Sequence, residues 1–272
     1  MQGASSSLTD ATEIEVALSP EQALALDAYA NLVRRWNPML GLVASKDLPR
    51  FADRHVVDGL VAAQVLRDAQ GSRSCEGLEV LDLGSGAGLP GVPLAVSLPE
   101  ASVTLVECSA RKSRFLRLAQ RELGLANVFV LCAELRQVPS ASADVVTARA
   151  LMPPPALWGQ AHRILRPGGH MLALDRVVRS RKAAAAVADS PADFPGGSIA
   201  RRHWAKMPIS TDRRVGLSHE PTIAPADRPP AGLRHRPVGL SAWHGLLVVT
   251  KDDPDHSGGK SEGRRRQDHD ER

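Results

Sequence analysis

The chain has 272 residues and a formal net charge of +4. Hydrophobic residues make up 43% and charged residues 24%, a balance typical of globular proteins that excludes a wholly disordered chain. Three cysteines without a C-x-x-C pair argue against a zinc site or a disulfide framework, and favour the reducing cytoplasm. A start without a basic, then apolar stretch, and no run of about 18 apolar residues, argue against export and membrane spanning.

Residues 1–18 are small and polar, so we expect a flexible N-terminus. The segment Ser19-Pro20-Glu21-Gln22 then reads as a helix cap, a first-turn proline and early acidic character. Apolar residues recur at helical spacing until Asn37-Pro38, which we expect to interrupt the helix. A second apolar-periodic stretch covers residues 56–66. Residues 19–70 are therefore predicted to form a helical N-terminal unit.

After a short linker at residues 71–77, the pattern changes to short β-rich runs that alternate with helical ones. The helix at residues 156–165 is predicted to end at Pro167-Gly168-Gly169. Such alternation is typical of a mostly parallel sheet covered by helices. The predicted strands are 78–83, 102–107, 128–131, 144–148 and 170–174, and the other predicted helices are 92–98 and 112–123.

Two further strands are predicted near the end of the chain, at residues 199–204 and 245–250. Between them the Pro-rich stretch has no strong periodicity, so residues 207–242 are expected to form an irregular insertion in a domain spanning 71–251. Residues 252–272 are charged and almost without apolar side chains, and we expect a disordered tail.

A glycine loop directly follows the first predicted strand and opens a helix, reading Asp82-Leu83-Gly84-Ser85-Gly86-Ala87-Gly88-Leu89-Pro90-Gly91. The loop formally satisfies the dinucleotide fingerprint, but a carboxylate at Asp82 would repel a phosphate. A cationic ligand without phosphate, such as S-adenosylmethionine, suits this position better. Its ribose needs an acidic acceptor at the end of the next strand, where Glu107 stands. The alternative is a tight turn with a helix-capping aspartate.

Residues 80–95, VLDLGSGAGLPGVPLA, are the most distinctive stretch of the chain. They are accompanied, in order, by Trp36-Asn37, Arg54-His55-x-x-Asp58, Lys112-x-x-Phe115-Leu116 and Thr147-Ala148-Arg149-Ala150. With these residues the chain resembles the bacterial small-subunit (16S) ribosomal RNA guanine-N7 methyltransferases, the glucose-inhibited division protein B (RsmG/GidB) family, over residues 24–251. The resemblance implies a class I S-adenosylmethionine-dependent methyltransferase: an α/β fold with a seven-stranded, Rossmann-like sheet behind an N-terminal helical extension.

The resemblance also assigns roles to individual residues. It implies that S-adenosylmethionine contacts Gly84, Leu89, Ala133, Glu134 and Arg149, in addition to Asp82, Gly86, Gly88 and Glu107 from the loop argument. Guanine N7 has an in-plane lone pair and no proton, so its attack on the methyl group needs no general base. Arg149 is then predicted to position the reacting groups; the alternative for this residue is a surface ion pair.

Three departures from the family pattern bear on RNA positioning more than on cofactor binding. Gly41-Leu42-Val43 stands where the family commonly has Asn-Leu-Thr, which removes two polar side chains. Cys132 replaces an arginine before the Ala-Glu pair. Leu174-Asp175-Arg176 replaces Leu-Lys-Gly, so that an acid stands in place of a cation.

Basic residues are concentrated in two segments that could neutralise RNA phosphates. Residues 176–214 contain nine Arg or Lys and three Asp, including Arg201 and Arg202, and the predicted helix at 112–123 adds more. A solvated basic face is the alternative. His55 is a further candidate for an RNA contact, and the alternative is a structural pair with Asp58.

The predicted function is therefore S-adenosylmethionine-dependent methylation of guanine N7 in 16S rRNA, with the small ribosomal subunit as partner, no membrane and no obligate protein partner. Three alternatives remain. One is a methyltransferase of the same fold acting on another RNA or a small molecule, and the second is a noncatalytic RNA-binding relative. The third, a nucleotide-dependent oxidoreductase, is disfavoured by Asp82.

Overall fold

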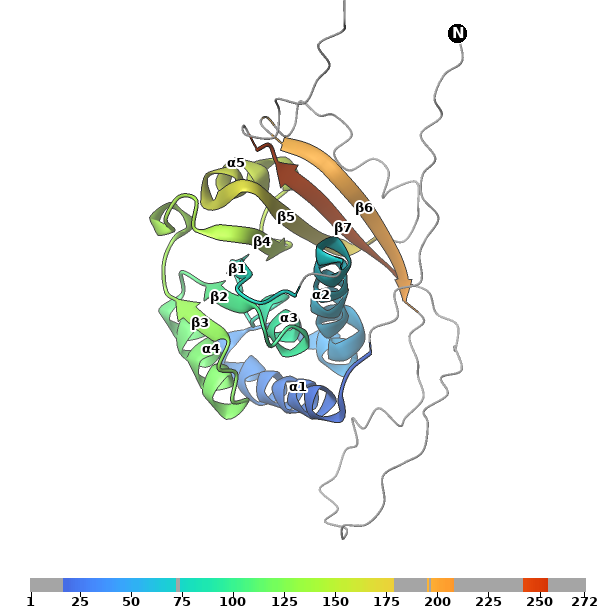
Figure 1. Cartoon of the computed structure of the whole chain (residues 1–272). Helices are drawn as coiled ribbons and strands as arrows, with labels where there is room; N and C mark the ends of the chain where they lie inside the picture. The colour runs from blue at the N-terminus through green and yellow to red at the C-terminus, as the bar shows by residue number, and fades with distance from the viewer. Residues whose placement is uncertain (1–16, 72–73, 179–194, 196, 208–241, 254–272) are drawn as a thin grey trace, which may run out of the picture.

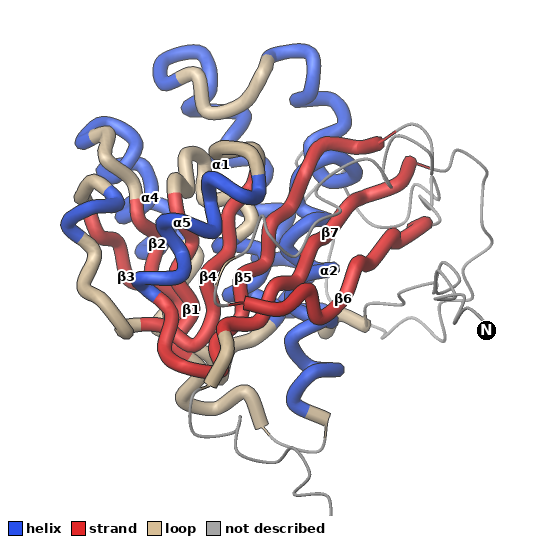
Figure 2. Tube along the Cα trace, turned by 90° about the horizontal axis from the view of Figure 1, so that it is seen from above, coloured by secondary structure: helices blue, strands red, loops and turns tan. Residues whose placement is uncertain are grey.

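The computed structural model describes residues 17–71, 74–178, 195, 197–207 and 242–253, and arranges them around one β-sheet (Figure 1). The sheet has seven strands in the order β3-β2-β1-β4-β5-β7-β6, which Figure 2 shows side by side. Neighbours from β3 to β5 are parallel, whereas β7 is antiparallel to both β5 and β6. The mostly parallel α/β fold is thereby confirmed. The strands are β1 (Glu79–Leu83), β2 (Ser102–Val106), β3 (Val128–Leu131), β4 (Ala143–Arg149), β5 (Leu165–Val178), β6 (Gly197–Met207) and β7 (Ala242–Lys251).

Five α-helices accompany the described strands, and none of them is long and apolar enough to cross a membrane. They are α1 (Pro20–Leu40), α2 (Val57–Gln70), α3 (Gly91–Ser97), α4 (Ala110–Glu122) and α5 (Pro154–Ile164). Three short helical turns cover Ser45–Arg50, Ala52–Val56 and Leu135–Gln137.

The first helix begins where its sequence predicts but extends further. The Ser19 side chain accepts a hydrogen bond from the Gln22 backbone, and the Gln22 side chain returns one to Ser19, a complete capping box. The predicted interruption at Pro38 is wrong. Since this proline stands in the last turn, its missing N–H removes a single hydrogen bond, and α1 continues to Leu40. Gly41, with φ +57°, ends the helix and donates its N–H to the Asn37 carbonyl.

The two faces of the sheet carry separate hydrophobic clusters. On one face, Val80, Val103 and Val145 pack with apolar residues of α1, α2, α3 and α4. On the other face, Leu81 and Val146 pack with residues of α5. Successive residues of a strand point to opposite faces, so β1, β2, β4, β5 and β7 each supply both clusters. Figure 1 accordingly shows α1 to α4 on one side of the sheet and α5 on the other.

The C-terminal half differs from the predictions at three points. Pro167-Gly168-Gly169 does not end a helix, because α5 stops at Ile164 and these residues lie within β5. They fall at a register shift, since Leu165 pairs with Ala143 whereas His170 pairs with Val145. Strands β6 and β7 are both longer than predicted. The predictions for residues 1–16, 208–241 and 254–272 lie outside the described residues.

Candidate functional site

Four predicted site residues lie at the same edge of the sheet. Gly84, Glu107 and Ala133 follow the carboxyl ends of β1, β2 and β3, and Arg149 is the last residue of β4. These four strands are consecutive neighbours and mutually parallel. In open α/β sheets of this kind, ligands bind at the carboxyl ends of the strands.

The glycine loop presents one open position at this edge. Gly84 has φ +69°, and a Cβ atom there would lie 2.6 Å from the Leu151 side chain. A Cβ at Gly88 would lie 2.6 Å from the Val92 side chain. Gly86 has φ +57°, but the nearest atom to its Cβ position, the Gly84 carbonyl oxygen, is 3.8 Å away. A ligand can therefore approach the backbone most closely at Gly86.

Glu107 connects this loop with the start of α4. Its Oε2 accepts a hydrogen bond from Gly86 N–H at 2.9 Å, and its Oε1 accepts one from Ser109 N–H at 2.8 Å. The residue is only 7% exposed, so both bonds are largely shielded from water. A carboxylate oxygen has two lone pairs. Oε1 also accepts a hydrogen bond from the Cys108 thiol at 3.8 Å, whereas Oε2 can accept one more from a ligand hydroxyl.

Asp82 lies beneath the loop. Its side chain is fully buried, Oδ2 accepts a hydrogen bond from Gly91 N–H at 3.2 Å, and Oδ1 has no hydrogen-bond partner within the described parts. Burial raises the pKa of Asp82 to about 7. The prediction that Asp82 presents its charge to a ligand is corrected here. Strand alternation turns this side chain toward α3, and Glu107 is the acid at the edge.

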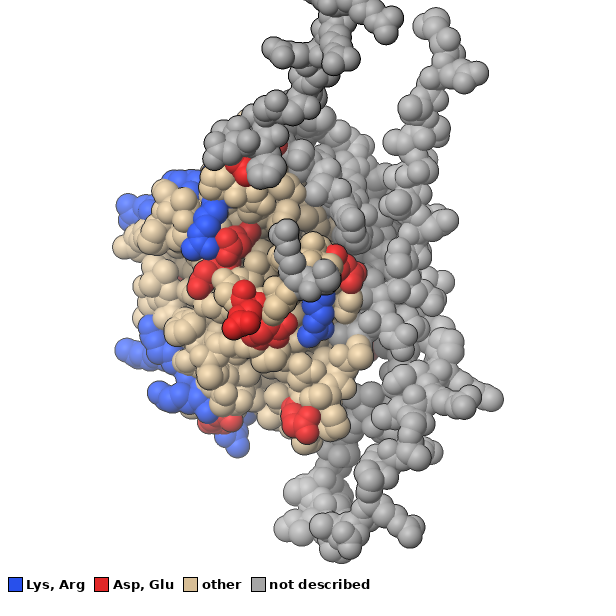
Figure 3. All heavy atoms as spheres, in the orientation of Figure 1, with Lys and Arg blue, Asp and Glu red and all other residues tan. Residues whose placement is uncertain are grey.

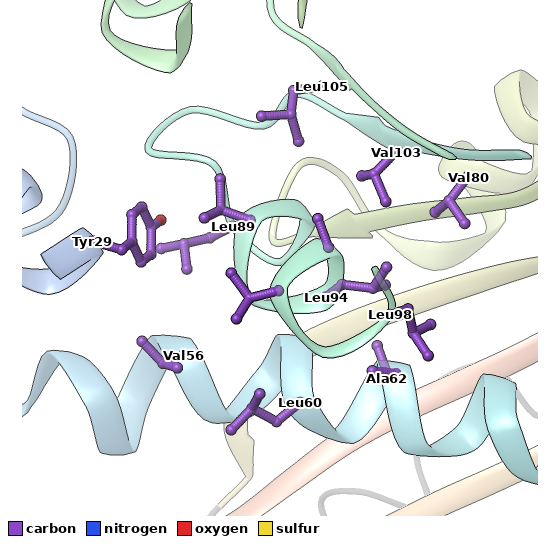
Figure 4. Close-up of a cluster of buried hydrophobic side chains, with 14 of the residues drawn as sticks. Tyr29, Val56, Leu60, Ala62, Val80, Leu89, Leu94, Leu98, Val103 and Leu105 are labelled. Atoms are coloured by element: carbon purple, nitrogen blue, oxygen red, sulfur yellow. The ribbon is translucent and has the colours of Figure 1, made fainter. Parts of the chain in front are cut away.

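Leu89 also points inward, contrary to the prediction that it covers the cofactor. It is 6% exposed and belongs to the hydrophobic cluster that includes Tyr29 and Leu94 (Figure 4). The Tyr29 hydroxyl donates a hydrogen bond to the Ala87 carbonyl at 2.9 Å, so α1 holds the loop from the same side. Sequence reasoning missed Leu151, a 37% exposed side chain that covers Gly84. Its only signal in the sequence is its place just after Arg149.

The segment after β3 continues toward the site. Ala133 N–H donates a hydrogen bond to the Glu107 carbonyl at 3.3 Å, which brings Ala133 beside Glu107. Glu134 is exposed, and its carboxylate accepts a hydrogen bond from Arg136 at 2.7 Å. This bond lowers the pKa of Glu134, and the Arg136 guanidinium balances the charge of the carboxylate.

Arg149 connects the end of β4 with the N-terminal helices. Its Nε donates to the Asp58 carboxylate, and its Nη2 donates to the Arg54 carbonyl at 3.1 Å. The Arg149 side chain is 18% exposed and that of Asp58 only 2%. The alternative for Arg149 is a surface ion pair. Arg149 does form an ion pair, but the pair is mostly buried. Two bonds fix the plane of the guanidinium.

His55 does not reach the surface, so the predicted RNA contact by this residue is wrong. The residue is 6% exposed, and its ring lies 5.4 Å from the Phe51 ring. Neither ring nitrogen has a hydrogen-bond partner among the described residues, and Asp58 is bound to Arg149 instead. Burial, with a contribution from the Arg149 charge, lowers the pKa of His55 to about 4. The ring is neutral at pH 7.

The two remaining predicted residues, Arg201 and Arg202, lie on β6, where they pair with Val248 and Leu247 of β7. Their side chains are not among the described atoms, so RNA binding by these residues stays a prediction. Within the described ranges, no group of three or more His, Cys, Asp or Glu side chains could hold a metal ion.

Comparison with known proteins gives a consistent result. The family model described as rRNA small subunit methyltransferase G matches residues 22–187. A protein of Methylococcus capsulatus is 38% identical over 196 residues, which cover 69% of this chain and 89% of that protein. A protein of Stenotrophomonas maltophilia is 35% identical over 220 residues, covering 76% and 94%. Both relatives are named ribosomal RNA small subunit methyltransferase G.

Proposed function

The chain belongs to the rRNA small subunit methyltransferase G family, and we propose that it methylates N7 of a guanine in the 16S rRNA of the small ribosomal subunit. It is an S-adenosylmethionine-dependent rRNA methyltransferase, and its substrate is an RNA. One observation carries the proposal: Glu107, the open loop position at Gly86 and the hydrogen-bonded Arg149 all lie at the same edge of the sheet.

The residues at this edge fit the proposed cofactor. S-adenosylmethionine supplies an electrophilic methyl group on a cationic sulfur. Glu107 retains acceptor capacity for ribose hydroxyls, and Glu134 adds a second acidic side chain. Gly86 leaves room for a close approach to the backbone, and Ala133 brings a small side chain next to Glu107. The Glu107 carboxylate beside the loop suits a cation better than the phosphates of a dinucleotide.

The protein has little proton transfer to perform in this reaction. Because guanine N7 attacks through a lone pair, orientation is the main contribution that the residues make. Arg149 is the residue proposed for this role, since its two bonds to Asp58 and Arg54 hold the guanidinium plane before a substrate arrives. His55 stays neutral and buried, and no step requires it.

The proposed substrate and the three free cysteines support a cytoplasmic location, where thiols remain reduced. Two of these cysteines are exposed: Cys132 follows β3 directly, and Cys108 lies two residues after the end of β2.

Methyl transfer to purified small subunits tests the proposal. We expect labelled methyl from S-adenosylmethionine to appear on 16S rRNA, at one guanine whose N7 modification makes the strand cleavable. Transfer to another base, or to another atom of guanine, would overturn the N7 assignment. Cofactor binding without any transfer would favour the noncatalytic alternative.

The cofactor site is tested separately with Glu107→Gln. An amide has one acceptor oxygen instead of two, so it cannot accept from both Gly86 and Ser109. We expect the affinity for S-adenosylmethionine to fall at least tenfold in calorimetry. Glu100→Gln is the matched control, since this exposed residue lies just before β2, at the opposite edge. Equal affinities of both variants would refute the role of Glu107.

A further inference from the structure

A pocket lies between the end of α1 and the start of α4, close to the edge of the sheet at which the carboxyl ends of β1 to β4 lie. It encloses about 290 Å³ and is lined by Trp36, Met39, Leu40, Phe115 and Leu118 together with Arg111 and Arg114. Aromatic rings and guanidinium planes therefore meet in one cavity. Unstacked nucleobases bind to such surfaces by stacking.

The pocket is continuous with a basic helix face. Arg111, Arg114, Arg117 and Arg121 recur three or four residues apart on α4, and all four are exposed. Within the described part of the chain, none of them has a carboxylate oxygen within 4.0 Å. Figure 3 shows Lys and Arg side chains gathered at the side of the molecule where α4 lies. Unpaired cations at this density suit a phosphate chain.

Two side chains of the pocket, Trp36 and Met39, have polar or apolar groups that are not matched by a partner within the described part of the protein. The Trp36 Nε1 is buried without a hydrogen-bond partner among the described residues, whereas Trp158 Nε1 donates to the Pro195 carbonyl. A buried donor without an acceptor is energetically unfavourable. Met39 is 64% exposed, so its thioether side chain is accessible to a ligand. Arg111 Nη2 donates to the Met39 carbonyl at 3.2 Å and so connects the two helices.

A pocket at the opposite end of the same two helices provides a contrast. It encloses about 550 Å³, is lined by Glu21, Gln22 and Asn127 among others, and has no Lys or Arg in its lining. The basic pocket is therefore not a general consequence of packing α1 on α4. The two arginines that line it, Arg111 and Arg114, lie at the end of α4 that follows Glu107, and Glu107 stands only four residues before Arg111.

We propose that the pocket between α1 and α4 binds an unstacked base of the rRNA close to the target guanine, with Arg111 and Arg114 on the adjoining phosphates. The inference rests on the proposed function, because it names a second contact of the same RNA.

Kinetics of two variants test the pocket against a matched control. Arg114→Gln should raise KM for small-subunit rRNA at least fivefold and reduce the salt dependence of binding by about one phosphate contact. Trp36→Leu should raise KM about tenfold, and Trp36→Phe less, because stacking on an aromatic ring contributes about 1–3 kcal/mol per base. The control, Arg166→Gln, removes the same charge at the start of β5, at the opposite edge, and should change KM less than twofold.

A second readout does not depend on turnover. In a variant that keeps Trp36 as its single tryptophan, small-subunit rRNA should quench the Trp36 fluorescence, since a stacked base is an efficient quencher. Calorimetric affinity for S-adenosylmethionine should remain that of the wild type in both pocket variants.

The outcomes separate the two proposals. If the wild-type protein does not methylate the rRNA, the proposed function fails. If it does, but Arg114→Gln behaves like Arg166→Gln and Trp36 is not quenched, the pocket proposal is overturned. Should Trp36→Leu lose its folded circular dichroism spectrum, Arg114→Gln and the quenching decide alone.

Discussion

At the scale of single residues, Arg149 is the side chain whose surroundings most resemble a prepared site. It combines a buried carboxylate, a backbone carbonyl and residual exposure at the carboxyl edge of the sheet. An arginine held in this way offers a planar fork that a lysine cannot reproduce. Its partners Asp58 and Arg54 come from a segment more than 90 residues earlier, so the site depends on the docking of that segment.

Arg149→Lys should lower kcat at least tenfold when S-adenosylmethionine is saturating, because a single ammonium cannot make both bonds in the same plane. Saturation removes any loss of cofactor affinity from the comparison. Circular dichroism should show an unchanged fold. A wild-type kcat for this variant would mean that the ion pair with Asp58 serves stability alone.

Asp82 predicts a pH dependence of stability. Its pKa is about 7 in the folded protein, against an ordinary value of 3.8 for an aspartate, so the folded state binds more protons between these values. The free energy of unfolding therefore falls as pH rises through this range, and the loss is complete above pH 7. The fall amounts to about 3 kcal/mol between pH 5 and 8.

Asp82→Asn removes this titration and can still accept the hydrogen bond from Gly91. The difference in unfolding free energy, wild type minus variant, should decrease by about 3 kcal/mol from pH 5 to pH 8 in urea titrations. Titrating groups that do not interact with Asp82 cancel in that difference. A difference that is the same at both pH values would contradict the raised pKa.

At the scale of elements, two helix glycines differ in what surrounds them. In α2, a Cβ at Gly59 would lie 2.5 Å from the Pro90 carbonyl oxygen and 2.7 Å from Pro93 Cβ. In α5, a Cβ at Gly159 would have no atom within 4 Å. Gly59 thus allows α2 to approach α3 closely, and it follows directly after Asp58, the partner of Arg149.

Gly59→Ala should destabilise the protein by about 1–3 kcal/mol, since backbone atoms of the glycine loop must move away. Gly159→Ala should stabilise it by about 0.5–1 kcal/mol, because alanine restricts the unfolded chain and favours the helix. Urea denaturation measures both changes. The same sign for the two substitutions would show that the packing of α2 on α3 is looser than described.

At the scale of the whole molecule, α1 and α2 share one hydrophobic cluster with α3, α4 and the sheet. The cluster contains Tyr29 and Leu66 from the N-terminal helices and Val80 and Leu172 from the strands. Removing α1 and α2 would expose to water the apolar surface that they cover on α3, α4 and the sheet. The N-terminal helices and the sheet are therefore expected to be stable only together.

Calorimetry should accordingly show one unfolding transition, with equal calorimetric and van't Hoff enthalpies. A fragment of residues 71–251 should lack that transition, because its apolar face is uncovered. Two transitions in the full chain, or a cooperative fragment, would instead make residues 19–70 an independent unit. S-adenosylmethionine should raise the transition temperature of the full chain by mass action.

The sequence by itself determined the features that depend on near neighbours in the chain. The start of α1 follows from the cap at Ser19, and the alternation of β1, α3 and β2 follows from local periodicity. Short-range interactions suffice for these elements, so composition and spacing predict them well. The residue sequence of the glycine loop likewise indicated the edge of the sheet at which the site lies.

Only the tertiary structure decided which side chains reach that edge. Asp82 and Leu89 turn inward beneath the loop, His55 is enclosed beside Phe51, and Arg149 finds Asp58 across 91 residues of chain. Each outcome depends on which face of a strand or helix meets which neighbour. That choice arises from the packing of distant segments, and spacing along the chain carries no information about it.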